Sequence, residues 1–514
     1  MDRMATNIAG IDLGTAFSAL AVLNAIGRPQ IVPNADGERL TPSAIYFDQD
    51  LIRVGTEALN CRYVNPDRCV RWVKRHIGDT TFRKQIDGMI WTAEALSALI
   101  LKKLKQDAEA QVGPIRQAVI TVPAHFDEIR RRATMDAGAA AGLEVIGIVN
   151  EPVAAALFYM ASCPVTGKVL VYDLGGGTFD VTILQVDGHD MQIICSNGDQ
   201  QLGGVDFDLQ VFRLMEQAYQ QATGTALIAS QEDRARYEDE AEDIKKTLSR
   251  RQTVKKILYG PGGPVRFELS REEFEHAIAK FVAKTEMLIE VALDEAGLRP
   301  DDIGQVLLVG GSSRIPVITQ TLQKLFGFTP ACAVNVDEAV ALGAAVHAGL
   351  TVLKQSPDLV PAGIAAGLRD IRYTDVCNHS YGTLCAPVDK KTGKRTIANH
   401  IIIRKNTPLP CEQTRTFYTL YDGQSHIEVT ITQGEDTDPR YVNKIATYRF
   451  ELPPGRPAGM PVRVTYSYDL NQRMHCRFED VQSGKVLEVD LPTDGSCMPQ
   501  QAKPNGQDRL IQSV

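Results

Sequence analysis

Two distant segments of the chain repeat one short pattern, in which a buried strand ends in Asp-Leu-Gly and a glycine turn leads into a second strand. The copies are GIDLGTAFS at 10–18 and YDLGGGTFD at 172–180, and their aspartates, Asp12 and Asp173, lie 161 residues apart. A hairpin repeated at that separation predicts a duplicated fold with two similar halves. We expect a ligand to bind in the cleft between such halves.

Glycine turns of this kind are suited to binding phosphate, because consecutive backbone N–H groups can point at one anion when no Cβ is in the way. Such turns occur at Gly14-Thr15, Gly175-Gly176-Gly177-Thr178, Gly203-Gly204 and Gly310-Gly311. The first two follow a strand-end aspartate, which can hold a hydrated Mg²⁺ beside the phosphates. The alternative for Asp12 and Asp173 is a structural role in capping the turn.

Buried strands alternate with helical stretches over the first two thirds of the chain. This alternation predicts an α/β domain over 1–355, and Pro, Gly and small residues then predict a linker over 356–375. We expect strands at 117–123, 169–174, 179–186 and 305–311, and helices at 127–141, 207–222, 231–249, 271–295, 315–326 and 337–353.

The pattern changes after the linker to short alternating segments without a helical period. They predict an all-β domain over 376–492, of a size that suits a sandwich. The polar segment 493–514 is expected to be a disordered tail. The predicted strands are 400–404, 414–421, 426–433, 448–452, 462–469, 474–480 and 485–491.

Composition argues against several classes of function. A net charge of −8 argues against broad nucleic-acid binding, which needs a basic surface. No apolar run approaches the ~18 residues of a membrane span, and the first residues lack a secretory signal pattern. Ten cysteines without a C-x-x-C pair and nine histidines without zinc-ligand spacing provide no metal or redox motif. We therefore expect a cytoplasmic protein with reduced thiols.

Seven motifs in order carry a resemblance to a known family. They are GIDLGTAFS, VITVPAHF, NEPVAAALFY, VYDLGGGTFDVTIL, NGDQQLGGVDFD, VLLVGGSSRIP and NVDEAVALGAAV. The chain resembles the DnaK-like seventy-kilodalton heat-shock chaperones, strongly over about 7–350 and more weakly over 400–491. The resemblance implies an actin-like (ribonuclease H-like) ATPase domain, a hydrophobic linker and a β-sandwich that binds extended peptides. It also implies ATP or ADP and Mg²⁺ as cofactors, with K⁺ as a further candidate.

The resemblance implies roles for single residues. Asp12 and Asp173 match metal-proximal carboxylates, and Asp180 matches a further cation-site carboxylate. Lys74 matches the lysine that reaches the γ-phosphate, and Glu151 matches the residue that orients the attacking water. Without the resemblance, the basic run around Lys74 is typical of a solvated face, and Glu151 is a charge at a helix N-terminus.

Two groups of residues are implied to surround the nucleotide. The phosphate turns comprise Gly14, Thr15, Gly175, Gly176, Gly177, Gly203 and Gly204, together with Thr178. The residues implied to be catalytic are Lys74, Glu151, Asp173 and Thr178. The adenosine side comprises Glu242, Lys245, Ser249, Gly310, Gly311, Arg314 and Asp337. The alternative for Glu242 and Lys245 is an ion pair on an exposed helix.

The β-domain is implied to hold an extended peptide through backbone hydrogen bonds and a side-chain pocket. Phe417 and Ile427 match the central apolar pocket, and Leu420 matches the arch over the bound chain. The alternative is that all three are ordinary sandwich core. No amphipathic helices follow Leu491, so we expect no helical lid, and with it fast peptide release and low affinity.

The chain departs from the family pattern elsewhere too. Ala16 replaces a second threonine in the first phosphate hairpin, which predicts slow turnover. The stretch between Gly78 and Leu96 is short, as in HscC-like branches of the family. Arg372 and Thr374 interrupt the apolar run of the linker, which predicts weaker coupling between the domains.

The implied partners are unfolded peptides, a nucleotide-exchange factor and a J-domain co-chaperone. Gly147 argues against the last, because the family's J-domain-contacting arginine lies there, although Pro123 and Arg131 match the relay between the domains. Two other functions stay open. One is a nucleotide-binding scaffold with little turnover, whose β-domain docks a dedicated partner. The other is a small-molecule kinase of the actin–hexokinase superfamily, which leaves the β-rich domain unexplained.

Overall fold

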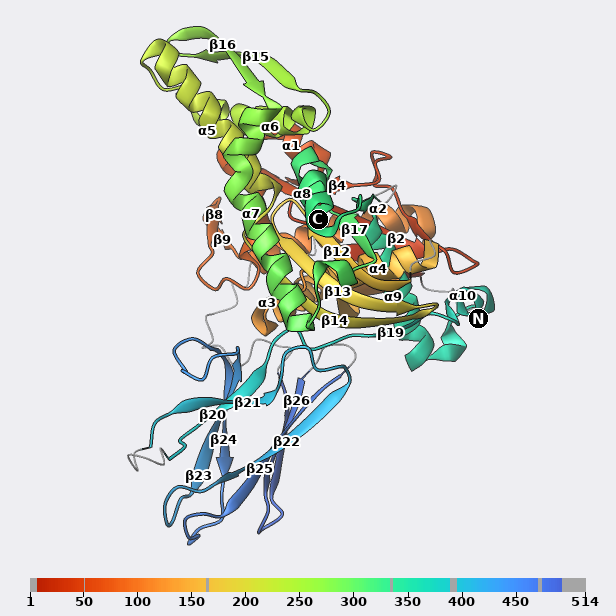
Figure 1. Cartoon of the computed structure of the whole chain (residues 1–514), viewed down its shortest axis with the longest axis vertical. Helices are drawn as coiled ribbons and strands as arrows, with labels where there is room; N and C mark the ends of the chain where they lie inside the picture. The colour runs from red at the N-terminus through yellow and green to blue at the C-terminus, as the bar shows by residue number, and fades with distance from the viewer. Residues whose placement is uncertain are drawn as a thin grey trace.

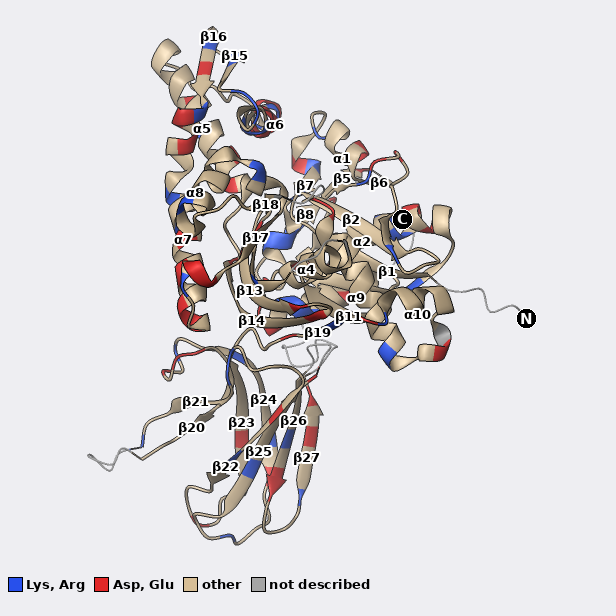
Figure 2. Cartoon of the chain, turned by 45° about the vertical axis from the view of Figure 1, so that its right-hand side comes forward, with Lys and Arg blue, Asp and Glu red and all other residues tan. Residues whose placement is uncertain are grey.

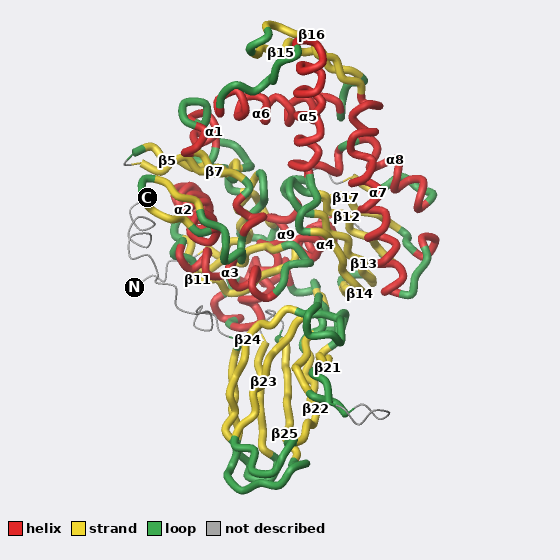
Figure 3. Tube along the Cα trace, turned by 90° about the vertical axis from the view of Figure 1, so that its left-hand side faces the viewer, coloured by secondary structure: helices red, strands yellow, loops and turns green. Residues whose placement is uncertain are grey.

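The protein consists of a mixed α/β unit followed by an all-β unit, as Figure 1 and Figure 3 show. The computed structural model describes residues 7–49, 51–162, 166–332, 336–388, 395–469 and 474–491. The predicted architecture of an α/β part and a β-sandwich is confirmed. The predicted tail, 493–514, and with it the expected lack of a lid, lie outside the described residues.

Two sheets of related topology form the centre of the α/β unit. Their strand orders are β11-β10-β1-β2-β3, with β4 paired to β2, and β18-β17-β12-β13-β14-β19. In each, an aspartate-bearing strand (β1 or β12) pairs antiparallel with the next strand and parallel with a later one, as the repeated motif predicts. The first sheet comprises β1 (Asn7–Asp12), β2 (Phe17–Leu23), β3 (Pro29–Ile31), β4 (Thr41–Pro42), β10 (Ile115–Val122) and β11 (Glu144–Asn150). The second comprises β12 (Gly167–Leu174), β13 (Phe179–Asp187), β14 (Asp190–Asp199), β17 (Gln305–Val309), β18 (Ala331–Cys332) and β19 (Arg372–Thr374).

Two helices rich in small residues join the halves. α4 (Glu151–Ser162) and α9 (Ala339–Gln355) pack on each other, and between them they contact strands of both sheets. A Cβ on Gly343 would lie 1.6 Å from the carbonyl oxygen of Ala154, and one on Gly10 would lie 2.0 Å from the nitrogen of Ala345. Only glycine allows these approaches, so the junction tolerates no larger residue at either position.

Further helices lie against the outer faces and the edges of the sheets. They are α2 (Ala93–Val112) and α3 (Glu128–Ala140) in the first half, and α7 (Arg271–Ala296) and α8 (Pro316–Phe326) in the second. α5 (Gly204–Thr223) packs on α7 and on α6 and β16 of the second half. The predicted helices correspond to α3 and α5–α9, with ends within three residues of those expected. Among the described residues, no helix is both long and apolar enough to cross a membrane.

Each half also carries a smaller lobe. The first lobe comprises β5 (Ala44–Asp48), β6 (Leu51–Val54), α1 (Thr56–Cys61), η1 (Pro66–Arg68), β7 (Cys69–Arg71), η2 (Val73–His76) and the hairpin of β8 (Lys84–Ile86) and β9 (Met89–Trp91). The second lobe, at the top of Figure 1, comprises α6 (Gln231–Leu248), β15 (Thr253–Gly260) and β16 (Gly263–Ser270). The β8–β9 hairpin occupies the short stretch between Gly78 and Leu96.

The all-β unit is a sandwich of two four-stranded sheets, ordered β21-β20-β23-β24 and β22-β25-β26-β27. Alternate residues of β25 and β26 are buried, and Ile431, Tyr466 and Phe478 lie in the core between the sheets. The strands are β20 (Tyr381–Cys385), β21 (Ala398–Ile403), β22 (Cys411–Tyr418), β23 (His426–Gln433), β24 (Asn443–Glu451), β25 (Pro461–Tyr468), β26 (Met474–Asp480) and β27 (Val486–Asp490).

The segment expected to be a plain connector has secondary structure. It contains η5 (Pro357–Leu359), α10 (Ala362–Leu368) and β19, which adds to the second sheet parallel to β14. The hydroxyl of Tyr373 lies 2.5 Å from His347 Nε2 on α9, and Lys354 Nζ lies 5.3 Å from the Tyr373 ring centroid. Arg372 is exposed, so its charge does not oppose this docking. The linker is therefore docked in this structure despite its interrupted apolar run.

The β-sandwich also contacts the α/β unit directly. His379 Nε2 lies 3.2 Å from the carbonyl oxygen of Phe126. The hydroxyls of Tyr381 and Tyr468 donate to the Glu128 carboxylate at 3.3 and 3.4 Å. Burial raises the pKa of Glu128, although the two tyrosine hydroxyls and the nearby Arg131 favour its charged form. The contact is polar and withdrawn from water.

Two further contacts frame this interface. Lys405 Nζ lies 2.8 Å from a carboxylate oxygen of Glu295, at the end of α7, where Figure 2 shows acidic residues near the sandwich. Arg131 lies buried behind the interface and donates to the Phe126 carbonyl at 3.0 Å and to Asn150 Oδ1 at 2.7 Å. Asn150 directly precedes Glu151, so a chain of contacts runs from the sandwich to the cleft.

Candidate functional site

The repeated hairpins open onto one large cavity between the halves, with a volume of about 1630 Å³. Most residues predicted to bind or act on a nucleotide line it, and they come from both halves of the sequence. They are Asp12, Gly14, Thr15, Lys74, Glu151, Asp173, Gly175, Gly176, Thr178, Glu242, Lys245, Ser249, Gly310, Gly311, Arg314 and Asp337. The tertiary structure thus brings together side chains that lie up to 325 residues apart.

Four predicted residues lie behind the cavity wall: Gly177, Gly203, Gly204 and Asp180. The nitrogen of Gly204 donates to the Gly175 carbonyl at 3.0 Å, and a Cβ on Gly203 would lie 2.5 Å from the Gly177 nitrogen. Gly203 and Gly204 therefore support the second phosphate turn from behind. Asp180 is buried, and its carboxylate accepts a hydrogen bond from the backbone N–H of His125 at 3.3 Å.

The two phosphate turns face each other across the halves. A Cβ on Gly177 would lie 2.6 Å from Thr15 Cγ2, and one on Gly176 would lie 3.0 Å from Ala16 Cβ. The second turn needs glycine at these positions so that the two backbones can come this close. The result is a narrow gap lined by backbone amides from both copies of the motif, which suits a chain of phosphates.

A buried lysine lies among carboxylates at the bottom of the cavity. The Lys74 ammonium contacts the Glu151 carboxylate and is only 6% exposed. Burial lowers the pKa of Lys74, but Glu151 and Asp12 outweigh that effect and the pKa is raised above its ordinary value. The lysine is therefore charged, and the prediction of a solvated basic face does not apply to it.

The three predicted metal-site aspartates repel one another and the neighbouring Glu151. Burial, followed by Glu151, raises the pKa of Asp12 to about 7 and that of Asp180 to about 8. The same two causes also raise the pKa of Asp173. One lysine does not balance this much negative charge, so the site is suited to a cation.

The geometry restricts how such a cation is held. Within the described ranges, no three or more His, Cys, Asp or Glu side chains converge as metal ligands. Asp12 and Asp173 face the cavity, whereas Asp180 is enclosed. This donor set fits a hydrated Mg²⁺ that takes few protein ligands and fills its sphere with water and phosphate oxygens. It does not form a cage for a bare ion.

The predicted adenosine side of the cavity carries charged side chains on both walls. Lys245 Nζ pairs with Asp208 at 2.8 Å and donates to the Gly204 carbonyl at 3.1 Å. Glu242 pairs with Lys246 instead, at 2.7 Å. The alternative of a simple Glu242–Lys245 pair is therefore wrong. On the opposite wall, Arg314 Nη2 lies 2.7 Å from Asp337, and both side chains are partly exposed.

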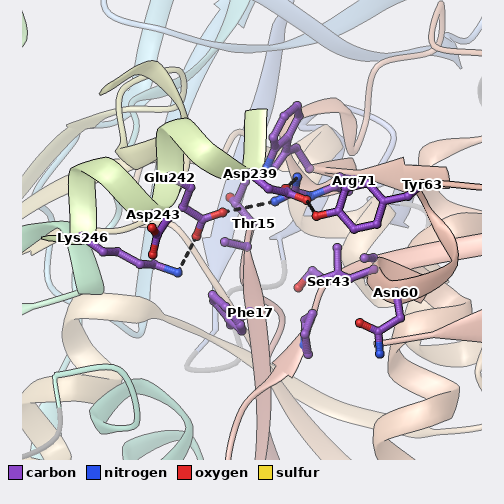
Figure 4. Close-up of a pocket in the computed structure, with 15 residues that line it drawn as sticks. Thr15, Phe17, Ser43, Asn60, Tyr63, Arg71, Asp239, Glu242, Asp243 and Lys246 are labelled. Atoms are coloured by element: carbon purple, nitrogen blue, oxygen red, sulfur yellow. Dashed lines mark hydrogen bonds and ion pairs between the residues drawn. The ribbon is translucent and has the colours of Figure 1, made fainter. Parts of the chain in front are cut away.

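Contacts that the sequence did not predict join the two lobes beside this cavity (Figure 4). Arg62 contacts Asp239 on α6 and lies 2.5 Å from Glu238. The hydroxyl of Tyr63 lies 2.5 Å from Asp239, and Arg71 Nη1 lies 2.9 Å from it. We call these five residues the interlobe clamp. Three of them, Tyr63, Arg71 and Asp239, line a smaller cavity of about 310 Å³. Thr15, Ala16 and Phe17 also line it.

The only sequence signal for the clamp is complementary charge. α6 is rich in Glu and Asp, and the first lobe carries Arg62, Arg68, Arg71 and Arg75 close together. Opposite charge alone does not show that two segments about 170 residues apart are partners. A basic segment can equally well face solvent or pair with a different acidic helix. The fold decides which of them meet.

The predicted peptide-binding residues lie in the β-sandwich with unequal exposure. Phe417 on β22 and Ile427 on β23 are half-buried and pack against the sandwich core. Leu420, just after β22, is 42% exposed, and its N–H donates to Gln424 Oε1 at 2.7 Å. The ring of His400 meets that of Phe417 edge-on at 5.6 Å. The roles of these residues in peptide binding stay predictions.

Comparison with known proteins agrees with this arrangement. The family model described as Hsp70 protein matches residues 8–505. The chain is 37% identical over 489 residues to the chaperone protein DnaK of Thermotoga neapolitana, with 93% of this chain and 79% of that protein covered. The DnaK proteins of Thermotoga petrophila and Thermotoga maritima match it with the same identity and coverage. The match extends through both the α/β unit and the sandwich, and the chain therefore belongs to the Hsp70 family of chaperones.

Proposed function

We propose that this chain is a molecular chaperone that binds and hydrolyses ATP and binds extended, unfolded peptide segments. The observation that carries the proposal is the Lys74–Glu151 pair, which lies buried among the aspartates beneath two facing phosphate turns. The proposed cofactors are ATP or ADP with Mg²⁺, and K⁺ is a further candidate at Asp180. The proposed compartment is the cytoplasm.

The contact between Lys74 and Glu151 suggests how hydrolysis proceeds. An arriving γ-phosphate competes for the Lys74 ammonium and leaves the Glu151 carboxylate free to accept a hydrogen bond from the attacking water. Backbone amides of the two turns hold the remaining phosphate oxygens, and Thr178 lies beside them. Asp12 and Asp173 would hold Mg²⁺, which would neutralise part of the phosphate charge when bound.

Nucleotide state is proposed to reach the β-sandwich through the docked linker and the interface around Glu128. Both sets of contacts belong to the docked arrangement of the domains. A nucleotide that binds the docked and the separated arrangement with different affinity therefore shifts the equilibrium between them. Phe417, Leu420 and Ile427 are the proposed peptide-contacting residues. A nucleotide-exchange factor is a proposed partner, and a J-domain protein is a less favoured one because of Gly147.

A second candidate is a nucleotide-binding scaffold with little turnover. Ala16 favours it, because this position supplies no hydroxyl to the gap between the two phosphate turns. Steady-state ATP hydrolysis, measured with and without an unfolded peptide, separates the two functions. Turnover that rises with peptide supports the chaperone ATPase. Tight nucleotide binding with no turnover, with or without peptide, contradicts it and supports the scaffold.

A further inference from the structure

Two thiols meet where the linker enters the β-sandwich. The sulfur atoms of Cys377 and Cys411 lie 4.0 Å apart. Cys377 is 0% exposed, and Cys411 is half-buried at the surface. The nucleotide cleft and the predicted peptide-contacting residues use neither thiol, and no sequence motif marks them, because 33 residues separate them.

The backbone holds the two cysteines in place. The N–H of Cys377 donates to the Thr407 carbonyl at 2.9 Å, and the N–H of Leu409 donates to the Asp375 carbonyl at 2.8 Å. Segment 375–377 therefore runs beside 407–409, and Cys411 follows two residues later. Cys377 leads into β20 of one sheet, whereas Cys411 is the first residue of β22 in the other.

We propose that Cys377 and Cys411 are a redox-active pair that forms a reversible disulfide between the two sheets by exchange with a small disulfide such as glutathione disulfide. A disulfide bond is about 2.05 Å long, so the sulfur atoms need to approach by roughly 2 Å. Side-chain rotation with a small backbone adjustment covers that distance, because the neighbouring backbone hydrogen bonds already hold the two segments together.

The exchange has two steps. The Cys411 thiolate attacks one sulfur of the small disulfide, the S–S bond breaks, and one thiolate leaves, so that Cys411 carries a mixed disulfide. Cys377 then loses its proton to the released thiolate and attacks Cys411 Sγ, which expels the second thiolate. That thiolate takes up the proton first lost by Cys411. The two cysteines are oxidised by two electrons in all, and the small disulfide is reduced to two thiols.

The environment decides which sulfur reacts first. A hydrogen bond joins the two thiols, and it lowers the pKa of Cys411 and raises that of Cys377. Burial raises the pKa of Cys377 further. Cys411 is thus both the more acidic thiol and the more accessible one, which assigns it the role of attacking sulfur and leaves Cys377 to resolve the mixed disulfide.

The test uses the full chain, reduced, freed of reductant and incubated with glutathione disulfide. Digestion without reduction, followed by mass spectrometry, is expected to show one peptide pair joined through residues 377 and 411. The cross-link is expected to disappear in Cys411→Ser and to persist in Cys385→Ser. The latter is a matched control, because it removes a partly buried thiol of the same domain and leaves the pair intact.

A second readout compares the oxidised and the reduced wild-type chain. Closing a loop of this length is expected to raise the thermal midpoint of the oxidised chain by roughly 5–15 °C over the reduced chain. The rise is expected to reverse with dithiothreitol, and Cys411→Ser, which cannot form the disulfide, is expected to show no rise. No cross-link between residues 377 and 411 in the wild type, a mixed disulfide that persists on Cys411, or an unchanged midpoint of the oxidised chain would overturn the proposal.

Discussion

At the scale of single residues, burial and neighbouring charges together set the pKa values of the ionisable groups in the cleft. Burial opposes the charged form of every ionisable group at its base, yet Lys74 keeps its proton because Glu151 and Asp12 surround it. Lys74 also favours the charged forms of the three aspartates, but burial and the repulsion from Glu151 outweigh it, so their pKa values rise. Lys74 is therefore the residue on which the electrostatics of the site depend.

Replacing Lys74 with Ala is expected to lower kcat for ATP hydrolysis by about 10²–10³-fold while nucleotide stays bound, because one fixed positive charge at the reacting phosphate is lost. Single-turnover hydrolysis and a separate binding titration measure the two effects. Lys105→Ala is the control, because this lysine is partly exposed and donates to the Gly142 carbonyl, outside the cavity. Hydrolysis at the wild-type rate in Lys74→Ala would remove the lysine from the mechanism.

A substitution at Ala16 is expected to raise the turnover rate. Its side chain lines both the large cavity and the smaller one, so a larger side chain has open space to enter. Ala16→Thr is expected to raise the turnover rate by up to about tenfold, because a hydroxyl can then donate to a phosphate oxygen in the transition state. Ala16→Val has nearly the same shape without the hydroxyl and serves as the control. Equal rates in the two variants would show that the hydroxyl has no part.

At the scale of elements, contacts hold together helices and strands that no shared sequence motif identifies as neighbours. α6 is joined to the first lobe by the interlobe clamp, and β19 is joined to α9 by Tyr373. Both contacts resist separation of parts that must move if nucleotide is to exchange or the domains are to part.

Arg62 is the most buried member of the clamp, with a side chain only 4% exposed. Arg62→Ala is expected to speed the release of a fluorescent ADP analogue by about tenfold, because Glu238 loses its partner on the other lobe and Asp239 keeps only Tyr63 and Arg71. Arg53→Ala is the matched control, since its partners Asp48 and Glu57 lie on the same lobe. If both variants release nucleotide at the same rate, the clamp does not hold the lobes together.

Tyr373 is expected to dominate linker docking. Tyr373→Phe removes the partner of a buried ring nitrogen on His347, which costs about 1–3 kcal/mol in the docked state. Backbone amides of 372–374, which belong to the strand pairing with β14, are expected to exchange hydrogen faster in this variant. Arg372→Ala changes an exposed side chain of the same strand and is expected to leave exchange unchanged. Equal exchange in the two variants would contradict the assignment.

At the scale of the whole molecule, the interface between the two domains includes several ionisable groups. They are His379, Tyr381, Tyr468 and Glu128. The stability of the interface therefore depends on keeping each group in the protonation state that the docked arrangement favours.

Docking is expected to weaken at acidic pH. Burial, followed by the adjacent His125, lowers the pKa of His379 to about 3, and Arg131 and Lys405 act in the same direction. On separation the imidazole regains water and its pKa returns towards 6.5. The docked form thus binds fewer protons, so its stability is complete above pH 6.5 and falls as the pH drops below that value.

At pH 5.5 the expected loss in docking free energy is about 1.4 kcal/mol. Fluorescence energy transfer between labels on the two domains, followed from pH 7.5 to 5.5, measures it. His379→Gln is expected to flatten the pH dependence, whereas His400→Gln, a change at an exposed histidine of the same domain, is expected to preserve it. An unchanged slope in His379→Gln would exclude this histidine as the cause.

Local patterns predicted the elements well. The alternation of strand and helix placed α3 and α5–α9 within three residues of their ends, and the repeated Asp-Leu-Gly hairpin indicated two halves around one cleft. The segment before β19 was harder, because its small residues suit a loop as well as they suit α10. What favours the helix there is packing beside α9, which no local pattern encodes.

The available chemistry follows from the chain's residue types and their close spacing, which identify the paired aspartates, the glycine turns and the lysine. Which distant groups meet is set by the fold. It enclosed Asp180, paired Arg62 with α6, docked Tyr373 on His347 and brought Cys377 to Cys411. Such contacts arise from the relative placement of whole elements, and that placement is set by the packing of both halves together.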